Sequence, residues 1–186
     1  MSTKIKSITF KSAEETIIGY VENYQLRDSN SPSSDKIPGK TMDLPRHADF
    51  ERAMDKLKPH LVIATGYAEP LDNLGNILTK DDFNEFFADK DNVPIAFKGL
   101  DVTGIIIQGK NAVDGVQILG TKTTDNGDVI KIKTGSIALK REAEGYNYPL
   151  VEILDEQIDY LLSEADKYHA RKKHGAGVQQ DLKLVG

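Results

Sequence analysis

The sequence contains no cysteine among its 186 residues. Disulfide bonds and cysteine-ligated metal sites are therefore excluded, and a reducing compartment is compatible with the chain. No stretch reaches the roughly 18 consecutive apolar residues of a membrane-spanning helix. The first ten residues, MSTKIKSITF, lack the apolar core of a signal peptide. We therefore expect a soluble, cytoplasmic protein.

An excess of basic charge is also missing. The chain has 24 Lys and Arg residues against 29 Asp and Glu, which gives a formal net charge of −5. A protein that coats nucleic acid usually shows a basic excess, so this class is disfavoured, although a local basic patch is compatible with the total. The length fits one domain with a full hydrophobic core.

One stretch resembles a nucleotide-binding loop but lacks the features that such a loop needs. Residues 104–110 read GIIIQGK and match the G-x-x-x-x-G-K skeleton. The middle residues 105–108 are mostly branched and apolar, as in a strand. Lys110 is followed by Asn111 instead of Ser or Thr, and no amphipathic helix follows. We predict that this segment binds no nucleotide and that Gly104 is a packing or bulge glycine.

Metal and catalytic motifs are absent as well. His47 and His60 bracket the first predicted helix, and His169 and His174 are five residues apart, so they diverge on a helix. Zinc sites prefer pairs such as H-x-x-x-H. The sequence therefore predicts surface histidines, no metal site, no cofactor and no catalytic residue.

The acidic stretch 67–98 lacks the spacing of a calcium-binding loop. We interpret it as a solvated acidic surface, with a hydrolase built around its acids as an alternative. The residues concerned are Glu69, Asp72, Asp81, Asp82, Glu85, Asp89 and Asp91.

The first half of the chain predicts a hairpin, a loop and a helix. Residues 4–10 and 16–24 read as two strands, and 27–40, rich in Ser, Pro and Gly, as a mobile loop. A helix should begin near Asp43 as N-cap with Pro45 in the first turn. Its apolar face is formed by Phe50, Ala53, Met54, Leu57, Leu61 and Ala64.

Three further signals in this half indicate where helices begin or end. Pro59 should kink or restart the helix and Gly66 should end it. Residues 79–82 fit a capping box that opens a short helix, which continues through Phe83, Phe86 and Phe87.

The stretch 101–139 is predicted to be β throughout, with strands at 102–108, 115–124 and 129–139. The turn Asp125-Asn126-Gly127 can close the last two strands in two registers. A two-residue loop aligns Val116 and Ile118 with Lys131 and Lys133. A three-residue loop with Gly127 left-handed aligns them with Ile130 and Ile132, and we prefer it because it buries one face.

The last element is a long amphipathic helix that starts at Asn147 and Pro149, runs to about Lys173 and stops at Gly175. Its stripe is Leu150, Ile153, Leu154, Ile158, Leu161, Leu162, Ala165 and Tyr168. The fold class is therefore α+β. An antiparallel sheet of about five strands carries two main helices in a single domain, 1–174, followed by a flexible C-terminal tail, 175–186.

One candidate phosphate-binding surface lies on the predicted sheet. In the preferred register, Lys131 and Lys133 share the exposed face with Thr121 and Thr123. Single-strand binders combine such a face with aromatic residues for base stacking, and residues 101–139 contain none. A stacking platform would have to come from Phe10, Tyr20 or Tyr24.

A second basic cluster closes the last helix, where cations also complement the helix dipole. It contains Lys167, His169, Arg171, Lys172, Lys173 and His174. We select Arg171, Lys172 and Lys173 as further candidates for phosphate contacts.

The tail carries a possible docking motif. Gln179, Leu182 and Leu184 resemble the short glutamine–leucine peptides by which replication proteins dock on bacterial sliding clamps. The segment 175–177 would supply a mobile tether. Alternatively, the two leucines fold back on the domain.

Three stretches together resemble a family of small, functionally uncharacterised α+β proteins of phages and prophages. They are HADFERAMDKLKPHL (47–61), VTG (102–104) with GVQILGTK (115–122), and the closing helix with its tail. Genes of this family lie near replication and recombination genes, which implies a role in DNA metabolism in an infected or lysogenic bacterial host.

The resulting hypothesis is a non-enzymatic accessory protein that binds single-stranded DNA weakly, docks on a replication partner such as a sliding clamp, or does both. The alternative is a small oligomeric protein, assembled from copies of this chain, that sequesters a nucleotide-like host molecule.

Overall fold

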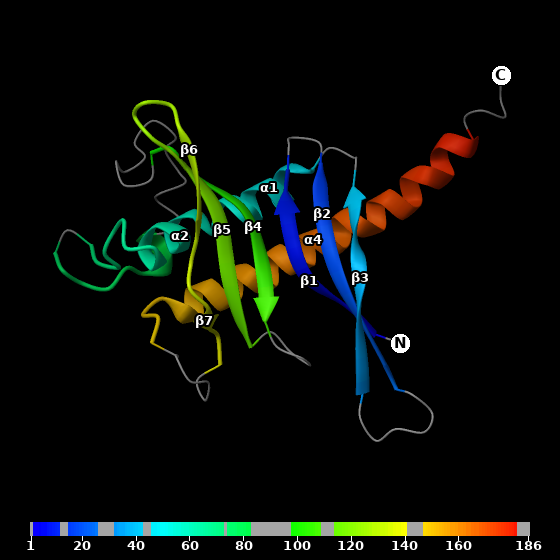
Figure 1. Cartoon of the computed structure of the whole chain (residues 1–186), viewed down its shortest axis with the longest axis horizontal. Helices are drawn as coiled ribbons and strands as arrows, with labels where there is room; N and C mark the ends of the chain where they lie inside the picture. The colour runs from blue at the N-terminus through cyan, green and yellow to red at the C-terminus, as the bar shows by residue number, and fades with distance from the viewer. Residues whose placement is uncertain are drawn as a thin grey trace.

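The computed structural model describes the backbone of residues 2–11, 15–25, 32–42, 46–72, 74–82, 98–108, 114–140 and 147–181. Within these ranges, the side chains of residues 2–4, 19–25, 32–42 and 170–181 are not described. The described residues form an antiparallel sheet with helices behind it (Figure 1). The α+β fold class is therefore confirmed.

The sheet is ordered β3-β2-β1-β4-β5-β6. Its N-terminal part contains β1 (Ser2–Phe10), β2 (Thr16–Gln25) and β3 (Pro32–Met42), and its second part contains β4 (Leu100–Gln108), β5 (Gly115–Thr123) and β6 (Val129–Lys133). A short strand, β7 (Ile137–Ala138), also pairs with β5. The two parts join where β1 pairs with β4, so residues distant in sequence form one continuous sheet.

Three helices cover one face of this sheet: α1 (Ala48–Asp55), α2 (Lys58–Ala64) and α4 (Val151–Asp181) (Figure 1). The core lies between the two layers, where Ile8, Ile105 and Ile118 of the strands meet Phe50 and Leu161 of the helices. All five side chains are fully buried. The apolar stripes predicted for the first and last helices therefore face the sheet.

Several local predictions are confirmed. Residues 4–10 and 16–24 lie in an antiparallel hairpin, and α2 restarts the helix with Pro59 in its first turn. Gly66, just beyond α2, has a φ of +79°, which suits a glycine that ends a helix. A bulge lies between Val102 and Gly104, as expected for a bulge glycine.

The preferred β5–β6 register is also confirmed. Thr121 pairs with Lys131 and Gly120 with Ile132, so Val116 and Ile118 share a face with Ile130 and Ile132. Gly127 has a φ of +85°, the left-handed conformation that the three-residue turn requires.

The mobile loop predicted at 27–40 is wrong for residues 32–40, because Pro32–Met42 forms strand β3. Its backbone pairs with β2 from Gln25↔Pro32 to Thr16↔Met42. The outer edge of β2 offers unpaired N–H and C=O groups. A polar segment can bond these groups through its backbone, whatever its side chains prefer. Residues 27–31 lie outside the described residues.

The start of the first helix differs from the prediction. The N-cap is His47, whose Nδ1 accepts a hydrogen bond from the Phe50 N–H at 3.2 Å. Asp43 and Pro45 lie outside the described residues. An imidazole nitrogen here replaces the carboxylate oxygen that we expected as the capping acceptor.

The predicted third strand at 129–139 is divided into β6 and β7 by Thr134. The buried Thr134 accepts a hydrogen bond from Ile118 N–H through Oγ1 at 3.0 Å and donates its own N–H to Ile118 O at 3.0 Å. The hydroxyl thus satisfies a backbone donor on β5 where the ladder is interrupted.

Both predicted ends of the last helix are wrong. α4 begins at Val151, after a turn in which Val151 N–H bonds Tyr148 O at 3.3 Å, and it continues to Asp181. Gly175 therefore does not stop the helix. A glycine in a helix interior costs only about 1 kcal/mol relative to alanine, and helix-forming Ala176 and Gln179 follow. Residues 182–186 of the predicted tail lie outside the described residues.

Candidate functional site

The face of the sheet that the described helices leave uncovered carries the two lysines selected from the sequence. Because Val116 and Ile118 point into the core, the alternate residues of β5 point away from the helices. The register brings Lys131 opposite Thr121 and Lys133 opposite Leu119 on this second face. Both lysines are exposed. We call Thr121, Thr123, Lys131 and Lys133 the open-face set; the structure brings them together as predicted.

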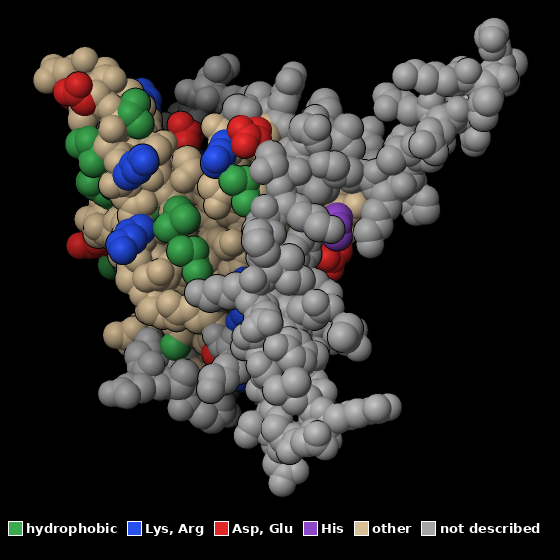
Figure 2. Space-filling model, turned by 45° about the vertical axis from the view of Figure 1, so that its right-hand side comes forward, with side chains coloured by type: hydrophobic (Ala, Val, Ile, Leu, Met, Phe, Trp, Pro, Cys, Tyr) green, Lys and Arg blue, Asp and Glu red, His purple; other side chains and the backbone are tan. Residues whose placement is uncertain are grey.

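The charge on these lysines is not neutralised by the described part of the chain. Neither Lys131 nor Lys133 forms an ion pair with a described residue, whereas Lys58 pairs with Asp101 at 3.3 Å. Exposed apolar side chains lie on the same face: Val129 is 65 % exposed and Ile106 is 39 % exposed. Figure 2 shows Lys and Arg side chains close to hydrophobic ones on this part of the surface.

An aromatic stacking platform is not provided by Phe10. Its ring packs edge-to-face on Phe50, with centroids 5.2 Å apart, and the Arg46 guanidinium lies 4.1 Å from its centroid. Phe10 therefore belongs to the core side of the sheet. The side chains of Tyr20 and Tyr24 lie outside the described residues.

The C-terminal candidates lie far from the open-face set. Arg171, Lys172 and Lys173 belong to α4, at the end that extends past β3, whereas β6 lies at the opposite edge of the sheet (Figure 1). Gln179 lies near the end of α4. Leu182 and Leu184 lie outside the described residues.

The prediction of surface histidines is wrong for His60, which is fully buried on α2. Its Nδ1 lies 2.8 Å from the Tyr148 hydroxyl. Burial lowers the pKa of His60 to about 3, although a hydrogen bond with Gln157 opposes the shift. Burial also raises the pKa of Tyr148. His60 and Tyr148 are therefore neutral, and their contacts connect α2 with the turn before α4 and, through Gln157, with α4 itself.

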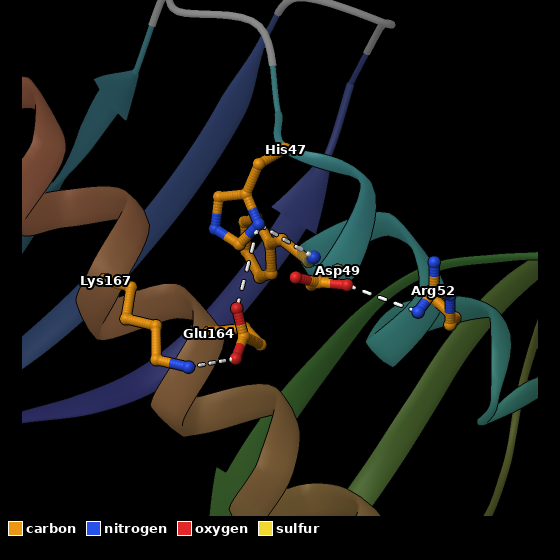
Figure 3. Close-up of polar contacts among 6 residues, drawn as sticks. His47, Asp49, Arg52, Glu164 and Lys167 are labelled. Atoms are coloured by element: carbon orange, nitrogen blue, oxygen red, sulfur yellow. Dashed lines mark hydrogen bonds and ion pairs between the residues drawn. The ribbon is translucent and has the colours of Figure 1, made fainter.

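A second group of titratable residues lies between α1 and α4 (Figure 3). His47 Nδ1 lies 3.7 Å from Glu164 Oε2, and Lys167 contacts the other oxygen of Glu164. Asp49 Oδ1 pairs with Arg52 at 3.2 Å. Sequence reasoning missed this group because 116 intervening residues separate His47 from Glu164. The available signal was a glutamate inside an apolar stripe, adjacent to Ala165.

Two described acids of 67–98, Asp72 and Asp82, organise their own turns. Asp72 accepts hydrogen bonds from the N–H groups of Leu74 and Asn76, both at 2.8 Å. A bond from the Asn76 side chain is the main reason that its pKa is lowered. In the predicted capping box, Asp82 Oδ2 accepts hydrogen bonds from the Thr79 N–H at 2.6 Å and from the Thr79 hydroxyl at 2.7 Å, and the hydroxyl bond lowers the pKa of Asp82. Glu85, Asp89, Asp91 and the phenylalanines at 83, 86 and 87 lie outside the described residues.

Comparisons with models of protein families, with curated proteins and with solved structures found no match. Among the described residues, none of the helices combines the length and apolar character needed to cross a membrane.

Proposed function

We propose that this chain is a non-enzymatic accessory protein of phage-type DNA metabolism, which binds single-stranded DNA weakly through the open sheet face. One observation carries the proposal. Lys131 and Lys133 are exposed, have no ion-pair partner among the described residues, and share with Thr121 the sheet face that the described helices leave free.

The chemistry of this face suits a phosphate backbone. Lysine supplies a compact positive charge with three donors, and a threonine hydroxyl can add a hydrogen bond to a phosphate oxygen. Lys131 and Lys133 are two residues apart on one strand, so their Cα atoms are separated by about 6.8 Å. This spacing allows the two ammonium groups to approach different phosphates of an extended strand.

The same face limits the affinity. Two lysine contacts correspond to a slope of about −1.4 in a plot of log K against log salt concentration for a single strand. Val129 and Ile106 offer apolar contacts to sugars and base faces. An aromatic stack, which is worth about 1–3 kcal/mol per base, is not supplied by the described side chains of this face. Weak, salt-sensitive binding is therefore expected.

The proposal also assigns a docking role to the C-terminal segment. Gln179, Leu182 and Leu184 would contact a replication partner such as a sliding clamp. Support comes from the course of α4, which extends past β3 and carries its C-terminal end away from the sheet (Figure 1). A partner could approach this end without covering the open-face set.

The test is fluorescence anisotropy with a labelled single-stranded oligonucleotide across a salt series. We expect Lys131→Glu and Lys133→Glu each to weaken binding several-fold and to reduce the salt slope. Lys80→Glu is the matched control, because it makes the same change of charge at an exposed lysine that pairs with Glu156 elsewhere. A chain that ends at Lys173 should retain DNA binding.

Three results would contradict or redirect the proposal. Absence of binding at low salt contradicts DNA contact. Unchanged binding by the Lys131/Lys133 double variant contradicts the assignment to the open face. Tight, salt-insensitive binding of a mononucleotide would instead favour the alternative function of sequestering a nucleotide-like molecule.

A further inference from the structure

The group at the junction of α1 and α4 has the composition of a metal site. His47, Asp49 and Glu164 each offer one ligand atom, and these three atoms lie within 4.8 Å of one another. Figure 3 shows His47 above Glu164, with one Asp49 oxygen directed toward the space between them and the other toward Arg52. Two segments distant in sequence thus bring one nitrogen and two oxygen atoms close together.

The distances suit a small divalent ion. Zinc binds nitrogen and carboxylate oxygen at about 2.1 Å, so two ligands of a tetrahedral ion lie about 3.4 Å apart. His47 Nδ1 and Glu164 Oε2 are already 3.7 Å apart. The Asp49 side chain is 58 % exposed. It can therefore rotate to bring a carboxylate oxygen to the ion without disturbing the core.

The environment of Glu164 favours an added positive charge. Its side chain is only 3 % exposed, and a buried carboxylate is costly unless it is paired. Lys167 contacts one oxygen, but the ammonium is on a side chain that is 64 % exposed. The other oxygen faces His47 across 3.7 Å, which is too long for a hydrogen bond. An ion between these atoms would neutralise the carboxylate more completely.

His47 can contribute a ligand without undoing the helix start. Its Nδ1 accepts a hydrogen bond from Phe50 N–H at 3.2 Å, but the same N–H also donates to His47 O at 3.0 Å. The backbone donor therefore keeps a partner when Nδ1 turns to an ion. Nε2 is buried and has no hydrogen-bond partner among the described residues, so the imidazole is incompletely satisfied as it stands.

We propose that His47, Asp49 and Glu164 form a site for a divalent transition-metal ion, with zinc as the first choice. One imidazole nitrogen and two carboxylate oxygens suit zinc or manganese, and three protein ligands leave a position for water. The ion would join the N-terminus of α1 to α4. This site is separate from the open-face set and does not depend on the proposed function.

The test uses the untagged full-length protein, freed of metal with a chelator, and isothermal titration with zinc chloride. We expect one equivalent of zinc to bind and the melting temperature to rise. Asp49→Asn and Glu164→Gln preserve side-chain shape, and each should weaken zinc binding by about tenfold or more. Asp159→Asn, an exposed acid on the outer side of α4, is the control and should not change the affinity.

His47→Ser gives an independent check, because serine is a favoured N-cap residue but offers no imidazole. It should start α1 normally and lose zinc affinity. Manganese binding with the same sensitivity to these variants would also support the proposal. The proposal is overturned if the folded protein shows no saturable binding of either ion. It is also overturned if Asp49→Asn and Glu164→Gln bind as the unaltered protein does, since this outcome indicates an adventitious ion only.

Discussion

At the scale of single residues, His47 and His60 have structural positions that their spacing in the sequence did not predict. His47 is an N-cap and His60 is buried among apolar residues of α2. Helical spacing places His60 next to core positions, but a polar side chain is more often exposed, so we expected it on the surface. A partner 88 residues away, Tyr148, makes the burial possible. Such long-range pairs satisfy buried polar groups, and a single sequence does not identify them.

The neutral state of His60 predicts how stability depends on pH. Its pKa is about 3 in the folded protein and 6.5 as the reference value, so the unfolded chain binds a proton more tightly. Above about pH 6.5, His60 should not reduce the free energy of unfolding. This free energy should fall by up to about 1.4 kcal/mol per pH unit between there and pH 3.

Urea unfolding at a series of pH values measures this dependence. His60→Gln removes the titrating group, so its stability should change less steeply with pH than that of the unaltered protein. Parallel pH profiles for the two proteins would show that His60 does not carry the effect.

At the scale of elements, the sequence predicted regular, amphipathic segments better than segments defined by a neighbour. The stripe of α4 and the β5–β6 register follow from periodicity and turn chemistry. Strand β3 was missed because its pairing with β2 depends on the free edge of that strand and not on its own composition. The C-terminal end of α4 was misplaced because the stop signal at Gly175 was weaker than the helical preference of the residues that follow it, whereas the N-terminal end was placed a few residues too early.

The junction of β1 and β4 depends on one glycine. A Cβ at Gly104 would lie 2.4 Å from the carbonyl oxygen of Ile8. The two strands would have to separate where the two parts of the sheet join. We expect Gly104→Ala to lower the free energy of unfolding by about 1–3 kcal/mol.

Gly135→Ala is the matched control, because a Cβ there would meet nothing within 4 Å. Its free energy of unfolding should change by less than about 0.5 kcal/mol. Chemical unfolding of both variants checks the difference. Equal stabilities would contradict the close approach of β1 and β4.

At the scale of the whole molecule, α1, α2 and α4 all cover one face of the sheet, and no helix of the described residues covers the opposite face (Figure 1). The sequence predicted this layered arrangement and the lysines on the free face. It did not predict the distance between these lysines and the basic end of α4, because that distance depends on the order of strands in the sheet. The two basic groups therefore lie apart from each other in the structure.

The most direct measurement is an NMR titration of isotope-labelled full-length protein with a short single-stranded oligonucleotide at low salt. If single-stranded DNA binds to the open sheet face, the amide shifts of Thr121, Thr123, Lys131 and Lys133 should move together, while those of the buried residues Phe50 and Ile158 stay in place. Shifts confined to α4 and the residues beyond it, or no shifts at all, would contradict binding through the open sheet face.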